Sequence, residues 1–191
     1  MSQAPDDPKP FPPFGVAKRE HVYESPWCSL RRDEVVLPNG QHQEYHVFEV
    51  GPAAVTVPVL PGGDLLLIGQ YRYTHGKTHW ELPAGRLNED EDPELGARRE
   101  LLEETGYGGS DWTRLAGFYP TGGISAHYAH AFLAKDCTRL QEPQHEAAEQ
   151  IIVQPFTRGE VEALLDSGRL EDAFTALPLL LYLRQSGLPR S

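Results

Sequence analysis

The segment from residue 92 to residue 107 constrains the fold of this chain most, because it carries signals for both ends of a helix. Asp92 followed by Pro93 is a typical N-cap and first-turn pair. Gly106 suits the C-cap, where the backbone commonly turns left-handed. Together these residues predict a helix from about Pro93 to Thr105.

Carboxylates crowd this helix and the loop before it, with eight between Gly85 and Tyr107. A helical projection places three of them, Glu100, Glu103 and Glu104, on one side, opposite an apolar side made of Leu95, Ala97, Leu101 and Leu102. The simplest interpretation is a solvated outer face with arginines nearby as counterions. However, each like-charged pair costs about 0.2–0.5 kcal/mol in an isolated helix, and a bound divalent cation reverses that penalty. Such oxygen ligands suit Mg²⁺ or Mn²⁺.

The whole chain is acidic, with a formal net charge of −11 over 191 residues. This charge argues against nucleic acid and anionic membranes as partners, and an acidic protein that handles a polyanion needs a cation between them. The longest apolar run, ALPLLLYL, is far too short to span a bilayer. Cys28 and Cys137 show no metal-ligand spacing, and in a chain without a signal sequence they suit a reducing cytoplasm.

The order of expected elements gives one main domain with an extension. Residues 1–24 are rich in proline and acidic side chains at their start and predict a disordered lead-in. Residues 25–50 predict a β-hairpin with a turn at Pro38-Asn39-Gly40, and a second hairpin is expected around residues 61–64. Further strands and two closing helices follow the acidic helix. This order predicts α/β/α or α+β layering rather than a doubly wound parallel sheet.

The spacing of the acidic segment carries a family resemblance. From Gly85, five residues lead to Glu91 and seven more lead to Arg99-Glu100-Leu101, and the segment then ends in Leu102-Glu103-Glu104-Thr105-Gly106-Tyr107. This pattern resembles the Nudix box, except that Tyr107 replaces the usual aliphatic residue. The resemblance implies the Nudix fold, an α/β/α sandwich with a mixed β-sheet between helices. It assigns residues 51–191 to a Nudix hydrolase domain behind an N-terminal β-hairpin extension.

The same resemblance implies roles for residues of the box. Glu100 and Glu104 become direct ligands of Mg²⁺ or Mn²⁺, and the carbonyl of Ala84 becomes a main-chain ligand. Glu103 becomes a ligand or the holder of a metal-bound water, and is therefore also a catalytic candidate. Arg99 would orient a glutamate, Glu91 would anchor the loop to the helix, and Gly85 would allow a tight backbone turn.

Residues outside the box bear on the substrate. The segment QYRYTHGKTHWELPAG resembles the ADP-ribose and nucleoside diphosphate sugar pyrophosphatase branch, in which Arg72 and Glu81 would contact the substrate. Trp27 is a candidate for stacking on the base, as is Tyr73, although core packing is the commoner use of such aromatic residues. Gly122 replaces a proline usual in that branch, so a GDP-mannose-type or other sugar substrate stays open.

The general base in the resembled enzymes is a glutamate on a loop ahead of the last strand of the sheet. Glu146 and Glu149 both lie in QHEAAEQIIV, which precedes an expected buried strand. Distance from Pro155 favours Glu146, whereas the Glu-x-Ile pattern favours Glu149. We take Glu146 as the first candidate and keep Glu149 as the alternative.

Other functions remain open from sequence alone. A Nudix module that binds nucleotide or RNA without hydrolysis generally lacks box glutamates, which this chain retains. An enzyme for nucleoside triphosphates or dinucleoside polyphosphates would not require the long N-terminal strands, which in the resembled branch predict a homodimer. His127 and His130 could suggest zinc, but without a third ligand at a known spacing they are interpreted as polar strand residues.

Overall fold

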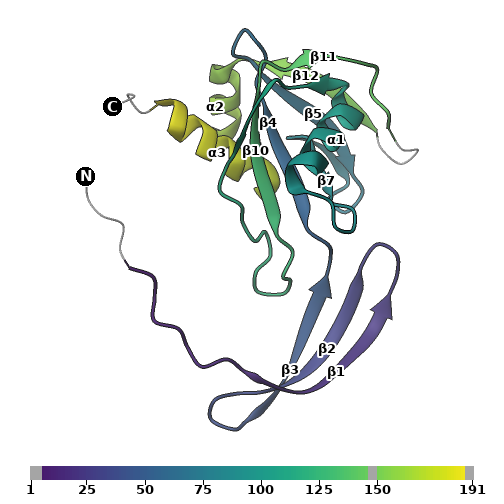
Figure 1. Cartoon of the computed structure of the whole chain (residues 1–191), viewed down its shortest axis with the longest axis vertical. Coiled ribbons are helices and arrows are strands. Elements are labelled where there is room, and N and C mark those ends of the chain that lie inside the picture. Colours follow the sequence, from purple (N-terminus) through teal and green to yellow (C-terminus); the bar gives the residue numbers. More distant parts are fainter. Residues whose placement is uncertain (1–5, 146–149, 188–191) are drawn as a thin grey trace. The chain divides into compact units, whose positions relative to one another are not determined.

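A computed structural model of the chain describes residues 6–145 and 150–187. Its backbone contacts divide the chain into two units, which are both drawn in Figure 1. The N-terminal unit comprises the residues up to Val50 together with residues 123–126, and the large unit comprises residues 51–122 and 127 onward. Within the described residues, no helix is long and apolar enough to cross a membrane.

The N-terminal unit is a three-stranded antiparallel sheet in the order β1-β2-β3, made of Gly15–Glu24, Ser29–Val36 and His42–Glu49. The turn between β2 and β3 closes through backbone hydrogen bonds from Leu37 to Gln41 and from Gly40 to Leu37. Gly40 has a φ of 82°, a left-handed conformation that glycine adopts without steric cost. The hairpin expected around Pro38-Asn39-Gly40 is therefore confirmed.

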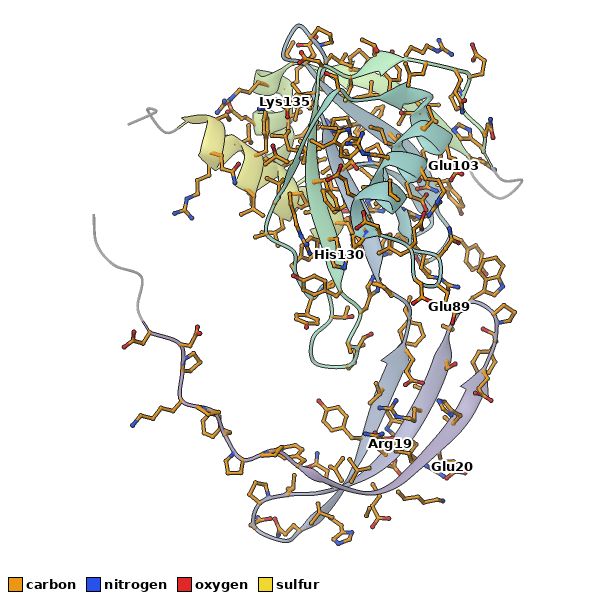
Figure 2. The ribbon with its side chains drawn as sticks, viewed as in Figure 1. Arg19, Glu20, Glu89, Glu103, His130 and Lys135 are labelled. Atoms are coloured by element: carbon orange, nitrogen blue, oxygen red, sulfur yellow. The ribbon has the colours of Figure 1, made fainter. Side chains whose placement is uncertain are left out.

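The expectation of a disordered lead-in over residues 1–24 is wrong for its second part, because β1 is a strand that pairs with β2 along its length, with two register shifts. Nearly all of its residues are exposed, so β1 has no alternating apolar side that would have indicated a strand. Its backbone pairs with β2, and Glu20 forms ion pairs with Lys18 at 3.0 Å and Arg32 at 2.9 Å. Hydrogen bonds from these two cations lower the pKa of Glu20 to about 2; Figure 2 labels Glu20 on β1.

The large unit contains two main sheets and a short two-stranded ladder. A mixed sheet has the order β7-β4-β10-β9, made of Ala84–Arg86, Ala53–Pro58, Ala129–Lys135 and Asp111–Arg114. An antiparallel sheet has the order β12-β5-β6, made of Ile151–Phe156, Leu65–Arg72 and Lys77–Glu81. The ladder pairs β11 with β8, made of Thr138–Arg139 and Tyr107–Gly108.

Helices cover both faces of the mixed sheet, as Figure 1 shows for α1 (Pro93–Thr105) and α3 (Ala173–Gly187). Alternate residues of a strand face opposite sides, and β4 and β10 use both sides for packing. Val55 of β4 joins the core formed with α3 and with α2 (Arg158–Asp166). Its neighbour Ala54 packs with Ala97 of α1. This layering confirms the expected α/β/α sandwich with a mixed sheet.

The second expected hairpin, around residues 61–64, is only partly correct. Val59 and Leu65 form a single antiparallel bridge at its turn. Beyond that bridge the two strands separate, because β4 pairs with β7 and β10 whereas β5 pairs with β6 and β12. Both strands are buried over most of their length, and Val55, Val57, Leu65 and Leu67 share one hydrophobic core.

Candidate active site

The ends of α1 are set by the residues that predicted them. The side chain of Asp92 accepts hydrogen bonds from the backbone N–H groups of Glu94 at 2.9 Å and Leu95 at 3.1 Å. At the other end Gly106 has a φ of 77° and its N–H donates to the carbonyl of Leu102. These caps satisfy backbone groups that a helix leaves without partners, so they fix the register of the glutamates between them.

The three box glutamates of α1 do not share one solvated face. Glu104 is buried, with 5% of its surface exposed, whereas the side chain of Glu103 on the same helix is 42% exposed (Figure 2). Leu95, expected on the apolar side, is 61% exposed. The helix packs into the core through Ala97 and Leu101. Glu104 lies on this packed side of the helix rather than on the acidic side, and it faces β7. The expected division of α1 into an apolar and an acidic side is therefore wrong at two positions.

Glu104 and Glu100 both reach the backbone of β7. The backbone N–H of Ala84 donates to Oε2 of Glu104 at 2.9 Å. A Cβ atom added to Gly85 would lie 2.1–2.2 Å from the carboxyl group of Glu100, which is far inside contact distance. Gly85 is not in a left-handed conformation, so the tight turn expected there is not the reason for glycine. Glycine is required because the Glu100 carboxylate occupies the space of a side chain.

Arg99 connects three carboxylates at this site. Its guanidinium donates to Glu91 through Nε at 2.9 Å, to Glu100 at 2.8 Å and to Glu103 at 3.0 Å. A further bond reaches the carbonyl of Arg86 in β7. Hydrogen bonding to Glu91, more than to the other two, raises the pKa of Arg99, and it lowers the pKa of Glu91 to about 2. Arg99 thus holds the loop before α1 and two box glutamates in one arrangement.

We predict that Glu91→Gln lowers the free energy of unfolding by about 1.5–3 kcal/mol at pH 7, the usual range for hydrogen bonds to charged groups. The pKa of Glu91 is lower in the folded protein than in the unfolded chain, so its stabilising effect is present above about pH 4.5 and lost as the pH falls toward 2. Urea unfolding of both proteins from pH 7 down to pH 3 measures the difference. A difference that grows as the pH falls would contradict this assignment.

Arg72 and Glu81, both expected to contact substrate, form an ion pair with each other. Nε of Arg72 donates to both carboxylate oxygens of Glu81, at 3.0 and 3.1 Å, and one terminal nitrogen donates to Oε2. This pairing raises the pKa of Arg72, and the charges of Glu104 and Asp172 contribute in the same direction. Glu81 is buried, while Arg72 is partly exposed. Because the charge of Glu104 acts on the pKa of Arg72, the Arg72–Glu81 pair interacts electrostatically with the box glutamates.

Trp27 and Tyr73 occupy different units. Trp27 belongs to the N-terminal unit, follows the β1 strand and has 74% of its surface exposed. Tyr73 follows β5 in the large unit and is also strongly exposed. Neither ring is used as a buried core residue, which was the commoner alternative for such side chains. Both roles in base stacking remain predictions.

The geometry around His127 and His130 does not support a zinc site. A guanidinium nitrogen of Arg114 lies 3.0 Å from Nδ1 of His130, and burial together with this cation lowers the pKa of His130 (Figure 2 labels His130). The ring of His127 packs against Phe174, with ring centroids 5.5 Å apart. A neighbouring cation disfavours a metal ion at His130, which is a polar residue of β10 as expected. The expectation of a strand is wrong for His127, which precedes β10.

Glu146 and Glu149, the candidates for the general base, lie outside the described residues. The positions that flank them in the chain are described. On one side, the backbone N–H of Gln144 donates to the carbonyl of Glu103 at 2.7 Å. On the other side, Tyr71 of β5 donates to the carbonyl of Gln150 at 3.4 Å. Before this segment the chain thus lies against the end of α1, and after it the chain enters β12 beside β5, the strand that carries Arg72.

Metal binding can be tested against the donor groups at β7 and α1. Over residues 6–145 and 150–187, no three histidine, cysteine or carboxylate side chains converge closely enough to hold a metal ion. Glu100 and Glu103 bond to Arg99, and Glu104 bonds to Ala84. The available donors are carboxylate oxygens, which suit Mg²⁺, and the lack of a side chain at Gly85 lets the Glu100 carboxylate lie against β7. The residues therefore fit the cation after rearrangement of side chains.

Sequence reasoning missed a buried contact that holds the backbone between Glu81 and Ala84. Thr175, in the first turn of α3, is fully buried, and its hydroxyl accepts the N–H of Leu82 at 3.1 Å. The same hydroxyl donates to Asp172 at 3.2 Å. The partner of Thr175 lies 93 residues away, and no local pattern indicates it.

Comparison with known protein families agrees with this geometry. A family model described as the NUDIX domain matches residues 50–173. The chain belongs to the Nudix hydrolase family. A second model, described as the nucleoside diphosphate sugar hydrolase N-terminal domain, matches residues 16–48 of this Nudix protein. The resemblance seen in the box is therefore confirmed, and the matched N-terminal region begins within β1.

Several curated proteins are similar over most of this chain. A protein named ADP-ribose pyrophosphatase from Bacillus subtilis is 30% identical over 159 residues, covering 83% of this Nudix chain and 86% of that protein. Another of the same name from Mycobacterium tuberculosis is 34% identical over 139 residues, covering 71% and 67%. A protein named GDP-mannose pyrophosphatase from Yersinia enterocolitica is 33% identical over 185 residues, covering 89% and 95%.

A solved structure shows the same fold. The crystal structure of an ADP compounds hydrolase has a TM-score of 0.82 to this Nudix chain at 20% sequence identity. The match covers 94% of this chain and 99% of that one. It therefore supports the fold over both the N-terminal strands and the large unit.

Proposed function

We propose that this Nudix protein is a Mg²⁺-dependent pyrophosphatase that cleaves ADP-ribose or a related nucleoside diphosphate sugar into a nucleoside monophosphate and a sugar phosphate. One observation carries the proposal. Glu100 and Glu104 meet the backbone of Ala84 and Gly85, and the charge of Glu104 acts on Arg72, a residue suited to a diphosphate. The similarity to proteins named ADP-ribose pyrophosphatase supports the choice of substrate.

The cation is assigned to residues that can supply oxygen ligands. We assign Glu100, Glu104 and the carbonyl of Ala84 as ligands of Mg²⁺, with Glu103 as a further ligand or as the residue that holds a water; Mn²⁺ suits the same donors. When bound, the cation neutralises negative charge on the diphosphate and lowers the pKa of water. Arg99 would keep Glu100 and Glu103 in place before the cation arrives, because it already bonds to both.

Residues outside the metal site bind the substrate and take the proton from water. Arg72, whose Nε and one terminal nitrogen are held by Glu81, can present its other terminal nitrogen to a phosphate oxygen. Glu81 thereby fixes the guanidinium and can also accept from a substrate hydroxyl. Glu146 or Glu149 would take a proton from water as its oxygen bonds to one phosphorus. The bridging P–O bond breaks in line, and the leaving phosphate departs as the sugar phosphate or the nucleotide.

The strongest alternative within this activity is a different sugar or base. The relative named GDP-mannose pyrophosphatase covers more of this chain than either relative named ADP-ribose pyrophosphatase. Gly122 in the loop after β9 agrees with a substrate that differs from ADP-ribose, because a Cβ there would meet only Tyr119 at 3.6 Å and the loop has room. A non-catalytic nucleotide-binding module is less favoured, since Glu100, Glu103 and Glu104 are all present.

A substrate panel tests the proposal. The full chain is incubated with Mg²⁺ and equal concentrations of ADP-ribose, ADP-glucose, GDP-mannose, UDP-glucose, ATP and diadenosine tetraphosphate, and products are identified by mass spectrometry. We expect a nucleoside monophosphate and a sugar phosphate from at least one ADP-linked sugar. Preference for GDP-mannose would support the alternative. Hydrolysis of none of them, with nucleotide binding retained, would indicate a non-catalytic module.

We also predict that the protein is a homodimer in the cytoplasm, in which the N-terminal unit packs on a partner copy. The sheet of that unit exposes several large apolar side chains, including Val16, Val22, Tyr23 and Phe48. Light scattering at micromolar concentration should give about twice the chain mass of 21.3 kDa. A mass equal to one chain would contradict the dimer. If the protein is a monomer, a chain that starts at Gly51 should be no less active than the full chain.

A further inference from the structure

The last turn of α1 is completed by a segment far away in the sequence. A helix leaves its final carbonyls without partners inside the helix. In α1 the carbonyl of Glu103 accepts the backbone N–H of Gln144 at 2.7 Å, and the carbonyl of Glu104 accepts Nε2–H of His145 at 2.8 Å. The second contact joins residues 41 positions apart. The carbonyls that receive these bonds belong to Glu103 and Glu104, two of the residues proposed to act at the metal.

Glu104 is therefore held at both ends. Its carboxylate accepts the N–H of Ala84 and its carbonyl accepts the imidazole of His145. The last turn of α1 contains no basic side chain of its own, and His145 supplies a side-chain donor there from outside the helix, beside the backbone donor of Gln144. Helix ends fray readily without such partners, and a shift of the last turn would displace the Glu104 carboxylate from β7.

We propose that His145 is a positioning residue for hydrolysis, which acts by holding the main chain of Glu104. This inference rests on the proposed function for its effect on rate, although the contact itself is independent of it. Groups that orient metal ligands from outside typically change activity or metal affinity by about 10–100-fold when removed. His145 does not touch the substrate in this assignment.

Three variants separate hydrogen bonding from packing. His145→Phe keeps a ring but removes the donor, and we expect kcat to fall by about 10–100-fold, with little change in KM. His145→Gln places an amide N–H at nearly the position of Nε2, so it should restore most of the lost kcat. His145→Asn is one methylene shorter and should behave like His145→Phe. Each kcat is referred to the folded fraction measured by circular dichroism.

Two further measurements do not depend on turnover. Mn²⁺ affinity, measured by electron paramagnetic resonance, should weaken in His145→Phe and recover in His145→Gln. Amide hydrogen exchange at Gln144 should become faster in His145→Phe, because its bond to Glu103 depends on the same contact. If the wild-type chain hydrolyses no member of the panel, the proposed function fails, while these two readouts still decide the role of His145.

The opposite pattern of results would overturn the inference. Full kcat, unchanged Mn²⁺ affinity and unchanged Gln144 exchange in His145→Phe would show that the hydrogen bond positions nothing. A His145→Phe variant more active than His145→Gln would show that ring packing, rather than donation to Glu104, is what matters. Equal losses in all three variants, matched by equal losses of stability, would indicate a purely structural residue.

Discussion

Glu104→Gln is expected to reduce hydrolysis about 10³-fold, because charge stabilisation at a metal is worth several kcal/mol and each 1.4 kcal/mol corresponds to a factor of ten. Glu100→Gln should have a similar effect. Glutamine at position 104 can still accept the N–H of Ala84 through its carbonyl oxygen, so the fold should persist. The measurement is kcat at saturating Mg²⁺ on the best substrate of the panel, with thermal unfolding in parallel.

Glu89→Gln provides the matched control. Glu89 is an exposed carboxylate on the loop before α1, which Figure 2 labels. Its loss changes the net charge as much as the loss of Glu104 does, and we expect near wild-type kcat. If Glu104→Gln also retained near wild-type turnover, the assignment of a metal to these carboxylates would be wrong.

Gly85→Ala tests the same site without removing a charge. The added Cβ would lie 2.1–2.2 Å from the Glu100 carboxyl group, so this side chain must move. We expect activity to fall although the variant keeps the side chains of both Glu100 and Arg99. A fully active Gly85→Ala variant would show that the contact between Glu100 and β7 is not needed for the reaction.

The second large effect is expected for the general base. Glu146→Gln should lower kcat about 10²- to 10⁴-fold, the usual range for a positioned base, and change KM and metal affinity little. Glu149→Gln should have a much smaller effect. Comparing both variants on one substrate under identical conditions measures the assignment directly.

A nearby carboxylate controls for charge in this segment. Glu142 pairs with Arg139 at 2.6 Å at the exposed end of the same loop, and Glu142→Gln should leave kcat unchanged. Loss of activity only in Glu149→Gln would transfer the role of base to that residue. Loss in neither variant would mean that the base lies elsewhere, with Glu103 as the remaining candidate in the box.

Local signals in the sequence determined the elements whose ends depend on neighbouring residues. The caps at Asp92 and Gly106 predicted α1 with its observed bounds, and Pro38-Asn39-Gly40 predicted the turn of the first hairpin. The spacing of the box predicted the family. Each of these features depends on contacts within a few positions along the chain, which is why a single sequence can show them.

Features that depend on distant segments were not visible in the same way. β1 forms through backbone pairing with β2 and exposed ion pairs, so its sequence has no apolar alternation to detect. The separation of β4 and β5 into different sheets depends on β6, β10 and β12, which compete for their edges. Local hairpin signals cannot indicate which partner prevails, because that depends on packing of the whole core.

The site shows the same division between sequence and tertiary structure. The sequence by itself supplied Glu100, Glu103 and Glu104 at the right spacing on one helix. Only the tertiary structure decided that Glu104 is buried against Ala84 and that Gly85 makes room for Glu100. The reason is physical: helical spacing fixes where the side chains start, whereas burial and hydrogen-bond partners depend on which segments of the chain pack against that helix.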